Sequence, residues 1–114
     1  MHRLRWKNFR IPAFYYAAIL SVSLIPRSGV EKVDSFLPLP NDKVLHLAVY
    51  TGFGFVLGGL PYSPMAVGTV GSLLGALDEQ IQRLAPGREV SLADWVADLL
   101  GISLGLALRR RFRP

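Results

Sequence analysis

The feature that most constrains this sequence is a set of four long apolar blocks, each close to the length that crosses a lipid bilayer. They cover residues 11–26, 44–60, 63–82 and 92–108. A helix needs roughly 17–25 mostly apolar residues to cross ~30 Å of hydrocarbon. Charged residues make up only 18% of the chain, against about 25% in a typical soluble domain. We therefore predict an all-α membrane bundle of four transmembrane helices.

The length of 114 residues leaves room for a single domain, 1–114. Only residues 61–64 (PYSP) separate the second block from the third, and proline marks tight turns. We expect these two blocks to form a helical hairpin. The chain has no cysteine, which excludes a disulfide framework, a thiolate nucleophile and a cysteine-based zinc site.

Basic residues are concentrated in the two tails outside the apolar blocks. The tails hold eight of the thirteen Lys and Arg residues and none of the eight acids. These residues are Arg3, Arg5, Lys7 and Arg10 before the first block, and Arg109, Arg110, Arg111 and Arg113 after the last. Lys and Arg in short flanks stay on the cytoplasmic side, so both termini are predicted to be cytoplasmic. The basic charge is assigned to anionic lipid, and nucleic acid is not an expected partner.

Residues 1–23 leave one alternative open. They combine a basic start, an apolar stretch and Ser21-Val22-Ser23, a pattern similar to a cleaved signal peptide. Cleavage would leave three spans and would spoil the agreement between the two basic tails. We expect the segment to remain as the first span.

Polar residues in the last three blocks recur at helical spacing and form one stripe per block. The stripes are Asp42, His46, Tyr50, Gly54 and Gly58; Gly68, Gly71, Gly75, Asp78 and Gln82; and Ser91, Asp94, Asp98, Gly101 and Gly105. Because successive spans run in opposite directions, the three polar ends are expected at one depth and the glycine ends at the other. Glycine lets helices approach closely, whereas ionisable residues within spans mark functional sites. The pattern predicts a tight bundle with a polar pocket in its outer half.

The residues of this predicted pocket suit work on a phosphorylated lipid head group. The candidate catalytic residues, which suit proton transfer or ligation of a divalent cation, are His46, Asp78, Glu79 and Asp94. The candidate substrate-binding residues are Asp42, Lys43, Tyr50, Gln82, Arg88, Ser91 and Asp98. Of these, Lys43 and Arg88 can hold a phosphate.

Simpler interpretations of the same residues stay open. Ser91, Asp42, Asp78 and Asp94 are residue types that cap helix ends, and the glycine stripes indicate packing. The sequence assigns no metal site, but Asp94 and Asp98 lie four residues apart and can share a hard cation. Magnesium or calcium is then expected rather than zinc, because the spans hold one histidine and no cysteine.

An ordered set of short motifs resembles the VanZ-like family. The motifs are Asp42-Lys43-x-x-His46-x-x-x-Tyr50, Asp78-Glu79-x-x-Gln82, Pro86-Gly87-Arg88, Ser91-x-x-Asp94 and Gly101-x-x-x-Gly105. They cover about residues 41–105. One departure is Asp98, because the family commonly has asparagine in this region, usually at the position of Ala97. The resemblance implies a multi-pass protein of the bacterial-type inner membrane. It also implies a link to susceptibility to teicoplanin-type glycopeptides, but no settled reaction.

Three functions from different classes fit these observations. The first is recognition or processing of a phosphorylated lipid head group, with a hydrolase or transferase as the enzymatic form. The second is a non-catalytic lipid-binding or transport module, and the third is an accessory structural subunit of a membrane complex. Membrane lipids are the expected partners, and the glycine faces allow a homodimer. Residues 28–41 are expected either to enter the outer leaflet or to cover the pocket.

Overall fold

The structure, a computed structural model, describes residues 6–36 and 42–112, and every element in these ranges is a helix. The elements are η1 (Trp6–Phe9, a 3-10 helix), α1 (Arg10–Ser23), α2 (Arg27–Phe36), α3 (Asp42–Leu57), α4 (Pro64–Gln82) and α5 (Leu92–Arg111). The predicted all-α class is therefore confirmed. The predicted number of helices is wrong, because α2 is an additional helix in the segment between the first two apolar blocks.

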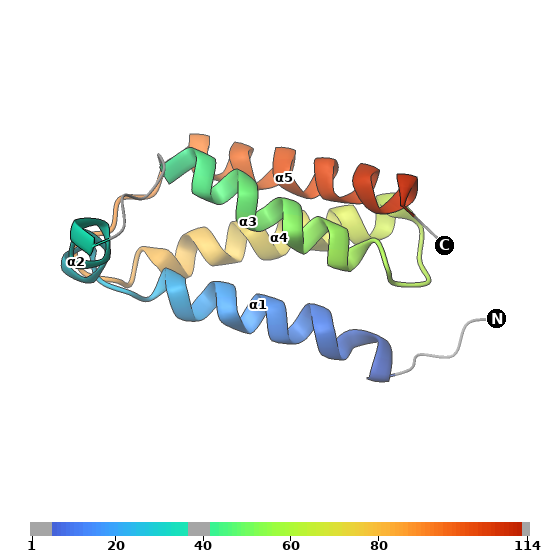
Figure 1. Ribbon diagram of the computed structural model, residues 1–114, viewed down its shortest axis with the longest axis horizontal. Coiled ribbons are helices and arrows are strands. Elements are labelled where there is room, and N and C mark those ends of the chain that lie inside the picture. The colour runs from blue at the N-terminus through green and yellow to red at the C-terminus, as the bar shows by residue number, and fades with distance from the viewer. Residues whose placement is uncertain (1–5, 37–41, 113–114) are drawn as a thin grey trace.

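The long helices α1, α3, α4 and α5 form a bundle, and α2 crosses one end of it (Figure 1). The start of α1 and the end of α5 both lie at the opposite end of the bundle from α2 (Figure 1). The polar ends of the stripes on α3, α4 and α5 accordingly meet at the α2 end, as the alternating direction of the helices predicts.

The lengths and compositions of the helices bear on the predicted membrane spans. Judged by length and composition, no single helix in the described ranges is both long enough and apolar enough to cross a bilayer. The α1 helix and residues Arg27–Ser35 meet that standard together, but they are bent by 95° at the break between them. The stretch Lys43–Leu57 is apolar but shorter. A transmembrane bundle therefore stays a prediction.

Two helix starts follow directly from local sequence. The predicted turn at residues 61–64 leads into α4, whose first residue is Pro64 and whose N-cap Ser63 accepts a hydrogen bond from the backbone N of Ala66 at 3.1 Å. Proline suits the first position of a helix because its missing N–H has no partner there anyway. At the start of α5, Ser91 and Asp94 form a reciprocal capping box. The helix-capping interpretation of these two residues is thus confirmed.

An aromatic cluster holds α1 against the rest of the bundle. Phe53 of α3 is buried and stacks against Tyr15 and Tyr16 of α1, with ring centroids 5.7 and 5.5 Å apart. The Tyr15 hydroxyl donates to the carbonyl of Val49, and the Tyr16 hydroxyl donates to the carbonyl of Leu74, both at 2.6 Å. Each tyrosine thus buries its ring while its hydroxyl finds an acceptor on a neighbouring helix.

The α3 and α5 helices make the closest backbone approach, and glycine permits it. A Cβ atom added at Gly101 would lie 2.7 Å from the carbonyl oxygen of Leu47 and 2.9 Å from the backbone N of Thr51. Added Cβ atoms at Gly54 and Gly105 would likewise meet backbone atoms of the facing helix. The prediction that these glycines serve close packing is confirmed.

We expect Gly101→Ala to lower the free energy of unfolding by about 1–3 kcal/mol, the usual effect of overpacking. The obstacle is backbone, which cannot move aside without separating α3 from α5. Gly75→Ala is the matched control, because its Cβ would lie 3.6 Å or more from Asp98 and Tyr50. Thermal unfolding of the purified proteins measures both, and equal loss from the two substitutions would contradict the packing argument.

Candidate functional site

Four carboxylates are buried where the polar ends of α4 and α5 meet α3. Asp78, Glu79, Asp94 and Asp98 have exposed fractions of 2%, 3%, 2% and 0%. A buried carboxylate is strongly destabilising unless charged or hydrogen-bonding partners compensate it. The identity of those partners therefore decides what each carboxylate can do.

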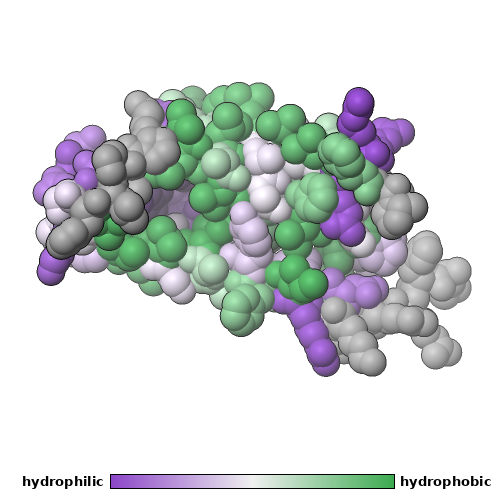
Figure 2. All heavy atoms as spheres, viewed as in Figure 1, coloured by the Kyte–Doolittle hydropathy of each residue, from purple (hydrophilic) through white to green (hydrophobic). Residues whose placement is uncertain are grey.

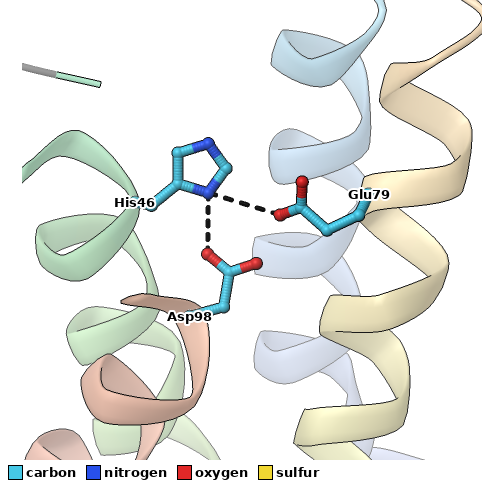
Figure 3. Close-up of side chains that lie close together, drawn as sticks. All are labelled: His46, Glu79 and Asp98. Atoms are coloured by element: carbon cyan, nitrogen blue, oxygen red, sulfur yellow. Dashed lines mark hydrogen bonds and ion pairs between the residues drawn. The ribbon is translucent and has the colours of Figure 1, made fainter. Parts of the chain in front are cut away.

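Three helices contribute one residue each to the centre of the site (Figure 3). Nδ1 of His46, from α3, lies 2.7 Å from Oδ1 of Asp98 on α5 and 3.4 Å from Oε1 of Glu79 on α4. The side chains point toward one another, and the other ring nitrogen points away from both carboxylates (Figure 3). We call these three residues the histidine–carboxylate cluster. Its members are 33 and 19 residues apart in the chain, so only the bundle brings them together.

Asp78 lies next to this cluster and accepts hydrogen bonds from two hydroxyl groups. Tyr50 of α3 donates to Oδ2 at 2.6 Å, and Ser23 at the end of α1 donates to Oδ1. Tyr50 was a predicted site residue, whereas Ser23 was missed. The only signal for Ser23 was its hydroxyl near the end of the first apolar block, where Ser21 offers a second one, and two serines two residues apart define no helical stripe.

Asp94 has a different environment from Asp98, although both lie on the same face of α5. Its Oδ1 lies 3.1 Å from Nζ of Lys43, and its Oδ2 accepts from the backbone N of Ser91 at 3.2 Å. Asp98 turns instead toward His46, so the two carboxylates that could share a hard cation have different nearest partners. The side chain of Asp42 lies outside the described residues.

Arg88 ties the loop between α4 and α5 to the corner between α1 and α2. Its guanidinium donates to the carbonyl of Ile25 at 2.7 Å and to the amide oxygen of Gln82, with that amide oriented to suit its neighbours. In the same orientation the Gln82 amide nitrogen donates to Oε2 of Glu79 at 3.1 Å. The preceding Gly87 has a φ of +75°, a backbone conformation that favours glycine.

A cavity of about 470 Å³ lies between α1, α2 and α3 and reaches part of this polar network. Its walls are apolar and include Ala18, Val22, Val30, Val33 and Val49. Its polar lining residues are Tyr15, Ser23, His46, Tyr50, Asp78, Gln82 and Arg88. Lys43, Glu79, Ser91, Asp94 and Asp98 do not line it. The predicted site residues are thus divided between those that line the cavity and those that do not.

The α2 helix bears on the two roles expected for residues 28–41. Val30 and Val33 are on the cavity wall, which is the arrangement expected of a segment that covers the pocket. Residues 37–41 lie outside the described part of the chain.

No family model, curated protein or solved structure matches this chain. The resemblance to the VanZ-like family therefore stays a prediction. The interpretation of the site rests on its geometry: a cavity with apolar walls, polar side chains that include the half-buried His46 at its base, and two buried carboxylates beside that histidine.

Proposed function

We propose that this chain is a membrane protein whose cavity binds the phosphorylated head group of a membrane lipid. The observation that carries this proposal is the amphiphilic lining of the cavity. Apolar side chains of α1, α2 and α3 form its walls, while Arg88, Tyr50 and Asp78 gather at its polar base. Its volume of about 470 Å³ is in the usual range of ~300–1,000 Å³ for small-molecule sites.

The surface of the bundle supports a membrane location. Large apolar side chains are exposed on all four long helices, among them Phe14, Val44, Met65, Val70, Leu73, Leu100 and Leu104. Figure 2 shows one such face, largely hydrophobic in the middle and hydrophilic at both ends. The α4 and α5 helices are about 28 and 30 Å long at 1.5 Å per residue, close to the ~30 Å hydrocarbon thickness. Exposed apolar area on this scale is typical of a lipid-facing surface.

Arg88 favours phosphate as the polar part of the ligand. It is the one Lys or Arg side chain among the described residues that line the cavity. A guanidinium has five N–H donors, and its forked geometry suits phosphate. Its bonds to Ile25 and Gln82 leave donors for a ligand. Binding is better supported than cleavage, because the candidate catalytic residue Asp94 pairs with Lys43 away from the cavity.

We expect Ala18→Trp to lower the amount of lipid that copurifies with the protein at least tenfold. Ala18 is exposed and lies on the cavity wall, so an indole there occupies the space intended for the ligand. Native mass spectrometry of the purified protein measures lipid bound per chain, and chromatography with mass detection of the extract identifies its head group. A phosphorylated lipid is the expected species.

Ala17→Trp is the matched control, because Ala17 is the exposed neighbour on α1 and is absent from the cavity lining. It should leave lipid occupancy unchanged. Equal loss from both substitutions would overturn the cavity as the binding site. Release of the wild-type chain from membranes by alkaline carbonate would contradict the membrane location on which the proposal depends.

A further inference from the structure

We propose that the histidine–carboxylate cluster binds a divalent first-row transition-metal ion. Each of His46, Glu79 and Asp98 offers one ligand atom, and these atoms all lie within 4.8 Å of one another. Among the residues that the structure describes, this is the only group of three His, Cys, Asp or Glu side chains arranged in this way. The inference goes beyond the proposed lipid site, because it is drawn from contacts between side chains of the protein and does not depend on a bound lipid.

The spacing of the donor atoms suits a single small cation. Metal–ligand bonds of about 2.0–2.2 Å to nitrogen and oxygen place neighbouring donors about 2.8–3.6 Å apart. Nδ1 of His46 lies 2.7 Å from the nearest oxygen of Asp98 and 3.4 Å from the nearest oxygen of Glu79. The third pair of donors, the carboxylate oxygens of Asp98 and Glu79, lies within 4.8 Å.

Two oxygen atoms of the cluster have unused capacity as ligands. Oε1 of Glu79 and Oδ2 of Asp98 are buried and accept no hydrogen bond. A buried acceptor without a donor destabilises the folded state, so such atoms need an explanation. A cation ligated by these carboxylates provides it, because the bound ion replaces the missing donors.

The net charge of the buried groups around the cluster also favours a divalent cation. Four buried carboxylates, Asp78, Glu79, Asp94 and Asp98, share this end of the bundle with the cationic side chains of Lys43 and Arg88. When His46 is neutral, as it must be to ligate a metal, these described groups carry two more negative charges than positive ones. One divalent ion makes the set electrically neutral, which is the favourable state for charges removed from water.

The nitrogen ligand decides the class of ion. Magnesium and calcium favour sites built of oxygen alone. A set of one imidazole and two carboxylates suits iron and zinc, which favour imidazole, and also manganese, which favours carboxylates. The sequence favoured magnesium or calcium because the spans hold a single histidine and no cysteine, and the structure places that histidine beside two carboxylates. Because His46 also lines the cavity, one residue would contact both the ion and the ligand of the proposed function; only that link rests on the lipid proposal.

The experiment is a titration of the purified, metal-stripped full chain with Mn²⁺, with free ion followed by electron paramagnetic resonance. We expect one tightly bound ion per chain, with pulsed spectra that show coupling to one imidazole nitrogen. Glu79→Gln and Asp98→Asn should each weaken binding at least tenfold. Glu89→Gln, which removes an exposed acid from the loop after α4, should bind as the wild type does.

Absence of nitrogen coupling in the wild-type complex would overturn the proposal without any variant, so it remains testable if a substitution prevents folding. Unchanged affinity in both folded cluster variants would also overturn it, because the ion would then lie elsewhere. A hundredfold excess of Mg²⁺ should leave the Mn²⁺ in place; displacement would contradict the nitrogen ligand. The titration contains no lipid, so its outcome is independent of whether the cavity binds one.

Discussion

His46→Leu is expected to lower the free energy of unfolding by about 3–5 kcal/mol, the range for removal of one partner from a buried ionic pair. The imidazole of His46 lies 2.7 Å from a carboxylate that is 0% exposed and 3.4 Å from a second one. Leucine fills the space but offers no hydrogen bond and no charge. Asp98 and Glu79 would then be buried close to each other without the imidazole between them. Thermal or denaturant unfolding in a fixed detergent measures the loss.

Converting the whole cluster to apolar residues should restore most of that stability. The combination His46→Leu, Glu79→Met and Asp98→Val removes every charge of the cluster at similar volume, and such replacements are often neutral or stabilising. The free energy of unfolding of the combined variant should be within about 1 kcal/mol of the wild-type value, or higher. Any function of the cluster should be lost. If His46→Leu alone lowered the free energy of unfolding no more than the combination does, the three residues of the cluster would not be energetically coupled.

The combined variant also separates a functional cluster from a structural one. A structural accessory subunit needs its polar groups only for folding, so a stable apolar bundle should serve it equally well. If the cluster binds a ligand or takes part in catalysis, the combined variant would fold and accumulate but would lose its function. Retained function in the combined variant would favour the accessory-subunit interpretation over the lipid-binding one.

Helical periodicity explains why much of the arrangement was predictable. Steps of three and four residues place Gly54, Gly101 and Gly105 on contact faces, and the structure packs them against facing backbone. The alternating direction of the helices then brings His46 and Asp98 to the same end of the bundle. Both inferences need only the 3.6-residue period and the chain order.

Partner choice was not predictable from the same pattern. Asp94 and Asp98 share one face of α5, but a rotation of a few tens of degrees decides which neighbour each one meets. Asp94 contacts Lys43 and the N-terminal turn of α5, while Asp98 contacts His46. Ser23 was missed for a related reason: its partner Asp78 lies 55 residues away in sequence. Periodicity indicates the face of one helix, but not the rotation of the next.

The α2 helix was missed because its signal is short. It spans ten residues, and the two that line the cavity, Val30 and Val33, give less than one full repeat of an apolar stripe. The prolines that follow in the sequence favour an irregular connection instead. The helix is amphipathic, and the backbone hydrogen bond that fixes its first residue, from the N–H of Arg27 to the carbonyl of Pro86, joins segments far apart in the sequence. Its place in the fold is therefore tertiary information.

Arg88→Met is expected to lower binding of a phosphorylated lipid about tenfold or more, the loss anticipated for hydrogen bonds to a charged group. Arg88 lines the cavity and is the charged donor there among the described residues. Native mass spectrometry with phosphatidic acid added to the delipidated protein measures the effect. Arg83→Met removes the same charge from the exposed residue that follows α4 and should leave binding unchanged.

The bonds of Arg88 to Ile25 and Gln82 make a purely structural effect the main competing explanation, and diacylglycerol distinguishes the two. That lipid has the same apolar tails as phosphatidic acid but no phosphate. If Arg88 contacts phosphate, Arg88→Met weakens phosphatidic acid binding far more than diacylglycerol binding, and Arg88→Lys gives an intermediate loss because it keeps the charge without the fork. Equal loss of both lipids would show that Arg88 shapes the cavity, and the phosphate part of the proposal would then fail.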